Sequence, residues 1–213
     1  MKTLTKEMQA AITPEMALNL LQEGNKRFIN NLKINRNLLQ QANETSDGQH
    51  PFAVVLSCID SRTSVELIFD QGLGDVFSIR IAGNIINEDI LGSMEFACKV
   101  AGSKFIVVLG HSKCGAIKGA CDHVEMGNLT DLLSKIQPAV YDEKTETENR
   151  NSSNSEFVEK VAVINVKRTV NAIMQRSPIL REMIELGEIG IIGANHDIAT
   201  GEVVFYENTL IIN

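Results

Sequence analysis

The chain has 213 residues, of which 44% are hydrophobic and 22% are charged, and its formal net charge is -7. This composition excludes a disordered chain, and no stretch approaches the roughly 20 apolar residues of a membrane-spanning helix. Nucleic-acid binding depends on clustered Lys and Arg, so the acidic balance argues against it. We therefore expect a globular protein with no nucleic-acid and no membrane partner.

The first predicted element is an amphipathic helix near the N-terminus. Thr13 and Pro14 form a helix-start signal, and apolar residues then recur at helical spacing as far as Phe28. Residues 32–50 are rich in Asn and Gln, which predicts an irregular surface connection. We expect residues 1–50 to form a helical arm and its connection, within the same domain as the unit that follows.

That unit, residues 51–213, contains short apolar runs of strand length. They cover residues 52–56, 76–81, 105–109 and 189–192, with helix-like stretches at 64–69 and 91–100 between the first three. This alternation predicts right-handed crossovers and a mainly parallel sheet with flanking helices, which is the α/β fold class. Towards the C-terminus we expect a polar loop or helix end, two helices and an edge strand, at residues 142–156, 157–173, 178–184 and 203–206.

The four cysteines are expected to be free thiols. The start of the chain lacks the apolar stretch of a secretory signal, so we expect a cytoplasmic protein in a reducing compartment. Cys98 and Cys121 have no second ligand type at suitable spacing, and each is predicted to be a small buried hydrophobe. Cys58 and Cys114, in contrast, lie where a metal-binding role is possible.

Residues that can bind a metal follow two of the predicted strands. Cys58 comes after the first strand, and His111 and Cys114 come after the third. Parallel strands present their carboxyl ends at one edge of a sheet, so neighbouring strands would bring these side chains together. Two thiolates and one imidazole suit zinc, and three protein ligands leave the open position of a catalytic site. A buried core pair of His111 and Cys114 without metal is the alternative.

Asp60 and Arg62 follow Cys58 by two and four residues. A guanidinium can bind a carboxylate through two parallel hydrogen bonds, which would fix Asp60 beside the open metal position. Two thiolates cancel the charge of zinc and weaken its effect on bound water, so a nearby proton acceptor or orienting group gains importance. An ordinary surface ion pair is the alternative.

Three segments together resemble the β-class carbonic anhydrases of bacteria. They are Cys-Ile-Asp-Ser-Arg at residues 58–62, Ala-Gly-Asn at 82–84 and Gly-His-Ser-Lys-Cys-Gly at 110–115. The resemblance extends from about residue 20 to the C-terminal strand. It implies a parallel sheet, a zinc cofactor and reversible hydration of carbon dioxide to bicarbonate. It also implies a homodimer or homotetramer in which N-terminal helices clasp the partner.

The resemblance also implies roles for individual residues. A zinc-bound hydroxide would attack carbon dioxide, with Asp60 and Arg62 as the catalytic pair. The implied zinc ligands are Cys58, His111 and Cys114, and the implied substrate-binding residues are Gln49, Phe77, Ala82 and Gly83.

Two other functions fit the same motifs. Carbonyl sulfide or carbon disulfide could be the molecule that the hydroxide attacks. Alternatively, Asp60 could close the metal site as a fourth ligand, which would give a non-catalytic zinc-stabilised scaffold or sensor. Family members with a bicarbonate-inhibited closed state commonly carry a Trp, and this chain has none, which favours the open arrangement.

Overall fold

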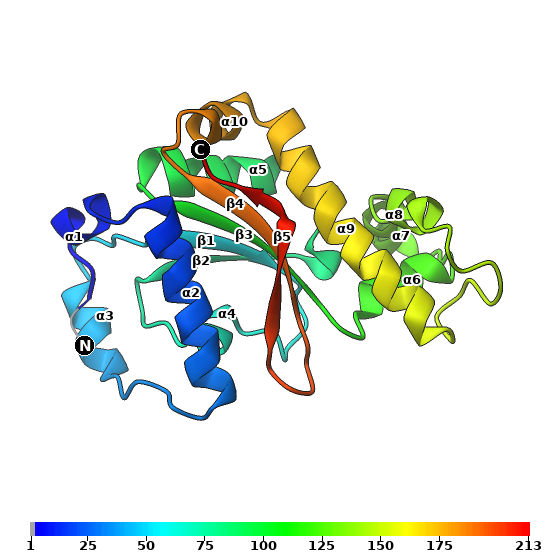
Figure 1. Ribbon diagram of the computed structural model, residues 1–213, viewed down its shortest axis with the longest axis horizontal. Helices are drawn as coiled ribbons and strands as arrows, with labels where there is room; N and C mark the ends of the chain where they lie inside the picture. Colours follow the sequence, from blue (N-terminus) through cyan, green and yellow to red (C-terminus); the bar gives the residue numbers. More distant parts are fainter. Residues whose placement is uncertain (1–2) are drawn as a thin grey trace.

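The computed structural model describes residues 3–213, whose strands form one sheet in the order β2-β1-β3-β4-β5 (Figure 1). The first four strands are parallel, and β5 runs antiparallel to β4. The predicted α/β class, with a mainly parallel sheet and a C-terminal edge strand, is confirmed. The strands are β1 (Ala53–Ser57), β2 (Val76–Arg80), β3 (Phe105–His111), β4 (Gly190–His196) and β5 (Val203–Ile211).

The central strands are the most apolar segments because both of their faces are covered. Every residue of β1 and β3 is buried, which explains why each reads as a continuous hydrophobic run. β4 continues four residues beyond the predicted end at residue 192, and these residues, 193–196, pair with β3 and β5. Register aligns His111 with His196, so the ends of β3 and β4 lie together.

Helices cover both faces of the sheet, and Figure 1 shows α2 in blue and α9 in yellow on either side of the strands. One face packs against α2 (Pro14–Ile29) and α4 (Val65–Ile68). The other packs against α5 (Glu88–Glu95), the π-helical turn η2 (Phe96–Val100), α9 (Ser155–Arg176) and α10 (Pro178–Glu185). No helix within residues 3–213 is long and apolar enough to cross a bilayer.

Three short helices gather beside one end of α9, away from the sheet (Figure 1). They are α6 (Gly115–Cys121), α7 (Gly127–Ser134) and α8 (Gln137–Asp142). Their apolar side chains form a third cluster with α9, and this cluster includes Cys58 and Cys114. The two cysteines therefore lie at the boundary between the sheet and this helical group.

The prediction of an irregular connection over residues 32–50 is wrong in its middle. α3 (Leu38–Glu44) forms there because the Asn37 side chain accepts a hydrogen bond from Gln40 N and caps the helix. α1 (Lys6–Ala10) was likewise not predicted, and Thr5 caps it in the same way. Both helices are too short to show the apolar periodicity that identifies longer ones.

α2 of the N-terminal arm packs on the sheet of its own chain. Asn25 donates from Nδ2 to Ile68 O and Gly201 O, and its Oδ1 accepts from Val203 N. Gly24, on the same helix, lies so close to α4 that an added Cβ would be 1.8 Å from Phe69 O. These contacts support one domain for the whole chain, although the division at residue 50 stays a prediction.

We expect Gly24→Ala to lower the free energy of unfolding by about 3 kcal/mol, because α2 must move away from α4 to admit the methyl group. Urea titration of the variant would measure the loss. Gly92→Ala on α5 is the matched control, since an added Cβ there meets nothing within 4 Å. Its higher helix propensity should raise stability by up to about 1 kcal/mol. Equal effects at both positions would contradict this account.

A buried ion-pair group also holds the arm. Asp70, 4% exposed, accepts from Arg27 Nε at 2.6 Å and from Arg36 Nη1 at 2.5 Å. Burial raises the pKa of Asp70, but the bonds from the two guanidiniums outweigh it and hold the pKa below its usual value. The group therefore stabilises the fold only while Asp70 is ionised.

We expect this stabilisation to disappear on acidification. The pKa of Asp70 is lower in the folded state, so its contribution is complete above the unfolded value of about 4 and falls as the pH drops below it. Asp70→Asn should cost about 3 kcal/mol near neutral pH, because Arg36 stays buried without a counter-charge. Urea titrations at several pH values should show a smaller cost in acid; a cost independent of pH would contradict the assignment.

Candidate metal centre

Cys58 is the first residue after β1, at the carboxyl edge of the sheet. Its side chain is 4% exposed, and its Sγ accepts a hydrogen bond from Gly83 N at 3.4 Å. Arg80, the last residue of β2, donates from Nε to Cys58 O at 3.0 Å and from Nη2 to Asp60 O at 2.6 Å. The neighbouring strand thus fixes the loop that carries Cys58.

His111 ends β3, and Cys114 is the N-cap residue of α6. The turn between them is held by Ser112, whose N donates to His196 O at 2.9 Å and whose Oγ accepts from Ile198 N at 3.0 Å. His111 Nδ1 lies 3.0 Å from Ser112 O. A carbonyl can only accept, so the ring proton lies on Nδ1 and Nε2 carries a free lone pair.

The three side chains converge. One ligand atom from each of Cys58, His111 and Cys114 lies within 4.8 Å of the other two, and all three residues are buried. The sulfurs are 4.0 Å apart, whereas two thiolates on a tetrahedral zinc would be about 3.8 Å apart. His111 Nε2 is buried with no hydrogen-bond partner among residues 3–213. The donor set and spacing therefore fit a soft divalent cation such as zinc.

The electrostatics of the two thiols favour a cation between them. The hydrogen bond with Cys114 lowers the pKa of Cys58 to about 4 against the opposing effect of burial. The same bond, burial and the charge of a Cys58 thiolate raise the pKa of Cys114 well above its usual value. The Cys58 thiol therefore loses its proton easily, and the Cys114 thiol does not. A divalent cation would offset the second charge and stabilise the fully ionised pair.

Asp60 lies beside this centre and is bound to Arg62. Its Oδ1 accepts from Arg62 Nε at 2.9 Å, and its Oδ2 accepts from Arg62 Nη2 at 2.7 Å. The bond to the guanidinium holds the pKa of Asp60 well below its usual range, although partial burial opposes this. Asp60 is therefore a carboxylate with oxygens directed at Arg62, outside the group of three metal-binding side chains.

Gly83 has a conformation and a setting that require glycine. Its φ is +68°, and an added Cβ would lie 2.6 Å from Ile136 Cδ1. Its N–H bonds to the Cys58 sulfur, and its carbonyl accepts from Asn165 Nδ2 on α9 at 2.9 Å. A larger residue would displace the N–H donor from the sulfur.

The other residues implied in substrate binding lie differently. Ala82 is half-buried and adjoins Gly83, whereas Gln49 is exposed in the segment before β1. Phe77 pairs with Val54, four residues before Cys58, which is about 13 Å along the strand. The Phe77 ring packs edge-on against Phe96, with ring centroids 6.4 Å apart. Within one chain, Phe77 therefore lies away from the metal centre.

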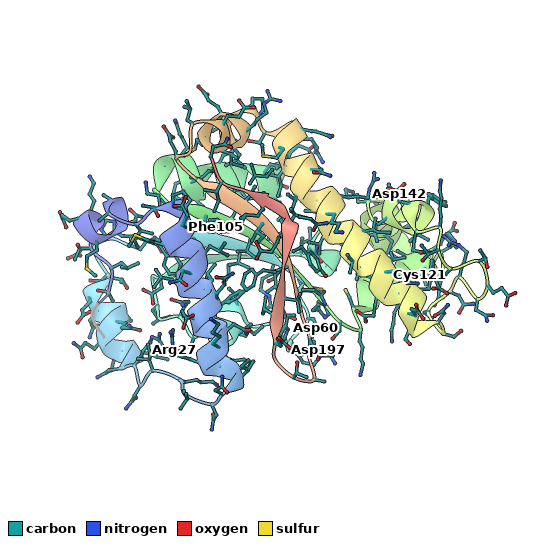
Figure 2. All side chains as sticks on the ribbon, in the orientation of Figure 1. Arg27, Asp60, Phe105, Cys121, Asp142 and Asp197 are labelled. Atoms are coloured by element: carbon teal, nitrogen blue, oxygen red, sulfur yellow. The ribbon has the colours of Figure 1, made fainter. Side chains whose placement is uncertain are left out.

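Two residues of the centre were not identified from the sequence. Arg80 holds the Cys58 loop, and its position at the end of a strand, directly before the Ile-Ala-Gly-Asn segment, was an available signal. His196 is buried beside His111 at the end of β4, close to Asp197, which Figure 2 labels near Asp60 at one end of the sheet. Burial lowers the pKa of His196 to about 4, so it is neutral at neutral pH.

Comparison with known proteins agrees with this geometry. The family model described as "Carbonic anhydrase" matches residues 53–203. Carbonic anhydrase 2 of Mycobacterium tuberculosis is 33% identical over 207 residues, which cover 92% of this chain and 94% of that protein. The carbonic anhydrase of Mycolicibacterium smegmatis is 31% identical, with 89% and 92% covered.

Solved structures give the same result. A tetrameric β-carbonic anhydrase from the fungus Sordaria macrospora aligns with a TM-score of 0.70 and 25% identity, covering 91% of this chain and 95% of that one. The β-carbonic anhydrase CcaA aligns with a TM-score of 0.72 and 25% identity, covering 92% of each chain. The chain therefore belongs to the β-class carbonic anhydrases, enzymes that interconvert carbon dioxide and bicarbonate.

Proposed function

We propose that Cys58, His111 and Cys114 bind zinc and that this site carries out the reversible hydration of carbon dioxide. The observation that carries the proposal is the convergence of two sulfurs and one imidazole from two strand ends, with Asp60 held beside them by Arg62. Three ligands are the number found in catalytic zinc sites, where the fourth position is left for water or substrate. When bound, zinc would supply a Lewis acid that makes a coordinated water acidic enough to attack carbon dioxide.

The residues around the metal centre tune the charge on its ligands and orient the attacking water. The Gly83 N–H withdraws charge from the Cys58 sulfur, which lessens the neutralisation of the cation by its two thiolates. Asp60 stays ionised because its pKa is far below neutral, so it is a weak proton acceptor and a good hydrogen-bond acceptor. We assign Asp60 the task of orienting the attacking water, with Arg62 fixing the carboxylate.

The arrangement of Asp60 speaks against the scaffold alternative. A non-catalytic site would need a fourth protein ligand, and Asp60 is the candidate next to Cys58. To become that ligand it must give up two bonds to the Arg62 side chain and one to Arg62 N. The arrangement in which the fourth metal position stays open therefore keeps these three hydrogen bonds, and the arrangement in which Asp60 binds the metal loses them.

We propose that the substrate-binding residues of one site come from two copies of the chain. Ala82 and Gly83 adjoin Cys58 in the same chain and would flank carbon dioxide there. Phe77 lies about 13 Å along the sheet, so we propose that it serves the site of a second copy of the chain. Gln49, exposed before β1, is proposed to hydrogen-bond the substrate.

A homodimer or homotetramer follows from the same reasoning. The arm exposes large apolar side chains, among them Leu32 at 68%, Leu38 at 54% and Leu39 at 74%. Such a surface needs covering in water, and the Sordaria macrospora relative is tetrameric. We propose the cytoplasm as the location, because all four cysteines are free and two of them are needed as metal-binding thiols.

Metal analysis combined with stopped-flow hydration of carbon dioxide tests the function. We expect about one zinc per chain and turnover that rises with pH as the attacking water loses its proton. Carbonyl sulfide and carbon disulfide should be assayed in parallel, and faster turnover of either would reassign the substrate. Zinc-loaded protein without hydration at any pH would refute the enzyme and favour the scaffold.

A further inference from the structure

A polar cavity lies between α9 and the segment that follows residues 82–84, and none of the three metal-binding residues lines it. It has a volume of about 280 Å³ and is lined by three cations, Lys135, Arg168 and Arg176. We propose that this cavity binds a small polyanion that carries phosphate or carboxylate groups. The function proposed for the metal centre does not require this site.

The two arginines on the rim are available to a ligand. Arg168 pairs with Asp142, and their side chains are 47% and 50% exposed. Figure 2 labels Asp142 among the short helices beside α9. Arg176 pairs with Glu88 at 2.7 Å, and the Glu88 side chain is 86% exposed. Exposed ion pairs of this kind contribute little to stability, so a bound anion can replace either carboxylate at small cost.

Charge and size define the class of ligand. Lys135 donates from Nζ to the backbone carbonyl of Asp131, which leaves its positive charge without a carboxylate in that contact. The three cations therefore face two carboxylates, those of Glu88 and Asp142, and the cavity has an excess of positive charge. Its volume of about 280 Å³ is just below the range of about 300–1,000 Å³ that is usual for small-molecule sites. A compact molecule with two or more negative groups would satisfy both arginine forks.

Two buried polar side chains line the cavity and are held in place by hydrogen bonds. Asn165 and Thr169 line it and are 3% and 5% exposed. Asn165 Nδ2 donates to Gly83 O at 2.9 Å, and Thr169 Oγ1 lies 3.5 Å from Asn84 O. These bonds fix both side chains from below while they face the cavity. Fixed polar groups beside exposed cations suit a ligand site, in which a few polar groups orient the ligand.

The Asn165 side chain also connects the cavity to a backbone amide whose NMR signal can report ligand binding. Gly83 accepts from Asn165 through its carbonyl and donates through its N–H to Cys58 Sγ. A ligand that shifts Asn165 therefore changes the environment of the Gly83 amide. This response does not depend on hydration activity, so it can be followed in the protein whether or not the metal centre is catalytic.

Titration of the metal-loaded chain of 213 residues with pyrophosphate and with citrate, at constant ionic strength, tests the proposal. We expect saturable binding of at least one probe by calorimetry, and shifts of the amide resonances of Gly83, Asn165 and Thr169. The probe that binds more tightly distinguishes phosphate from carboxylate chemistry. Arg168→Gln combined with Arg176→Gln should weaken binding about tenfold or more, because both bidentate contacts are lost. Hydration without the probes should stay unchanged.

Arg181→Gln provides the control for a lost surface charge, because Arg181 is exposed on α10 and its replacement removes one positive charge outside the cavity, where the double variant removes two from its lining. It should bind both probes as the wild type does. The proposal is overturned if neither probe binds, if the double variant binds as tightly as the control, or if amide shifts are confined to Gly83 and residues 58–62 and 111–114 and spare Asn165 and Thr169, which would place the anion on the metal. Circular dichroism of each variant verifies that it is folded.

Discussion

Cys114→Ser is expected to abolish metal binding and, with it, carbon dioxide hydration. A serine hydroxyl stays protonated at neutral pH and is a poor ligand for a soft cation, so two ligands would be left. Loss of an outer contact to a metal ligand already weakens binding about 10–100-fold, and loss of a ligand should exceed that. Metal content after dialysis and stopped-flow hydration would measure both effects.

Cys98→Ser is the control for this substitution. Cys98 and Cys114 are both 2% exposed, but Cys98 belongs to the apolar cluster on the sheet face covered by α5 and α9. Burial raises the pKa of Cys98 to about 12, so it is a neutral thiol. The control should lose some stability and keep its metal and its turnover. Wild-type metal content in the Cys114 variant would remove the basis of the proposed site.

The central strands and the meeting of the two metal-binding cysteines could both be predicted from the sequence. β1 and β3 are continuous apolar runs because they are buried on both faces, and their position in the sequence could be predicted for that reason. Cys58 and Cys114 were predicted to meet because both follow such strands, and their sulfurs are 4.0 Å apart in the structure. Short-range pattern and parallel topology together were sufficient for these features.

Other features depend on contacts between distant segments. α3 depends on the cap at Asn37, and seven residues are too few to show helical periodicity. The place of Arg80 depends on the β1–β2 register, which puts it opposite Ser57 and within reach of the Cys58 carbonyl. The distance of Phe77 from the metal centre follows from the same register. The resemblance to the family implies a substrate-binding role for Phe77 but does not say in which copy of the chain this role would be served.

Asp60→Asn is expected to lower turnover about a hundredfold or more while zinc stays bound. The amide has one oxygen to accept from Arg62 where the carboxylate has two, and its NH₂ group would face a guanidinium that can only donate. The side chain should therefore turn away from Arg62 and lose its fixed position beside the metal. A stopped-flow assay paired with metal analysis separates this effect from loss of the cofactor.

The pH dependence of the variant distinguishes orientation from proton transfer. The pKa of Asp60 is held well below its usual range, so the carboxylate cannot take up a proton to any useful extent near neutral pH. If Asp60 orients water, the variant should be slow at every pH, and added buffer should not restore its rate. If it relays protons, concentrated buffer should rescue turnover. Asp131→Asn, an exposed residue on α7, controls for the change of charge and should leave both rate and metal content unaltered.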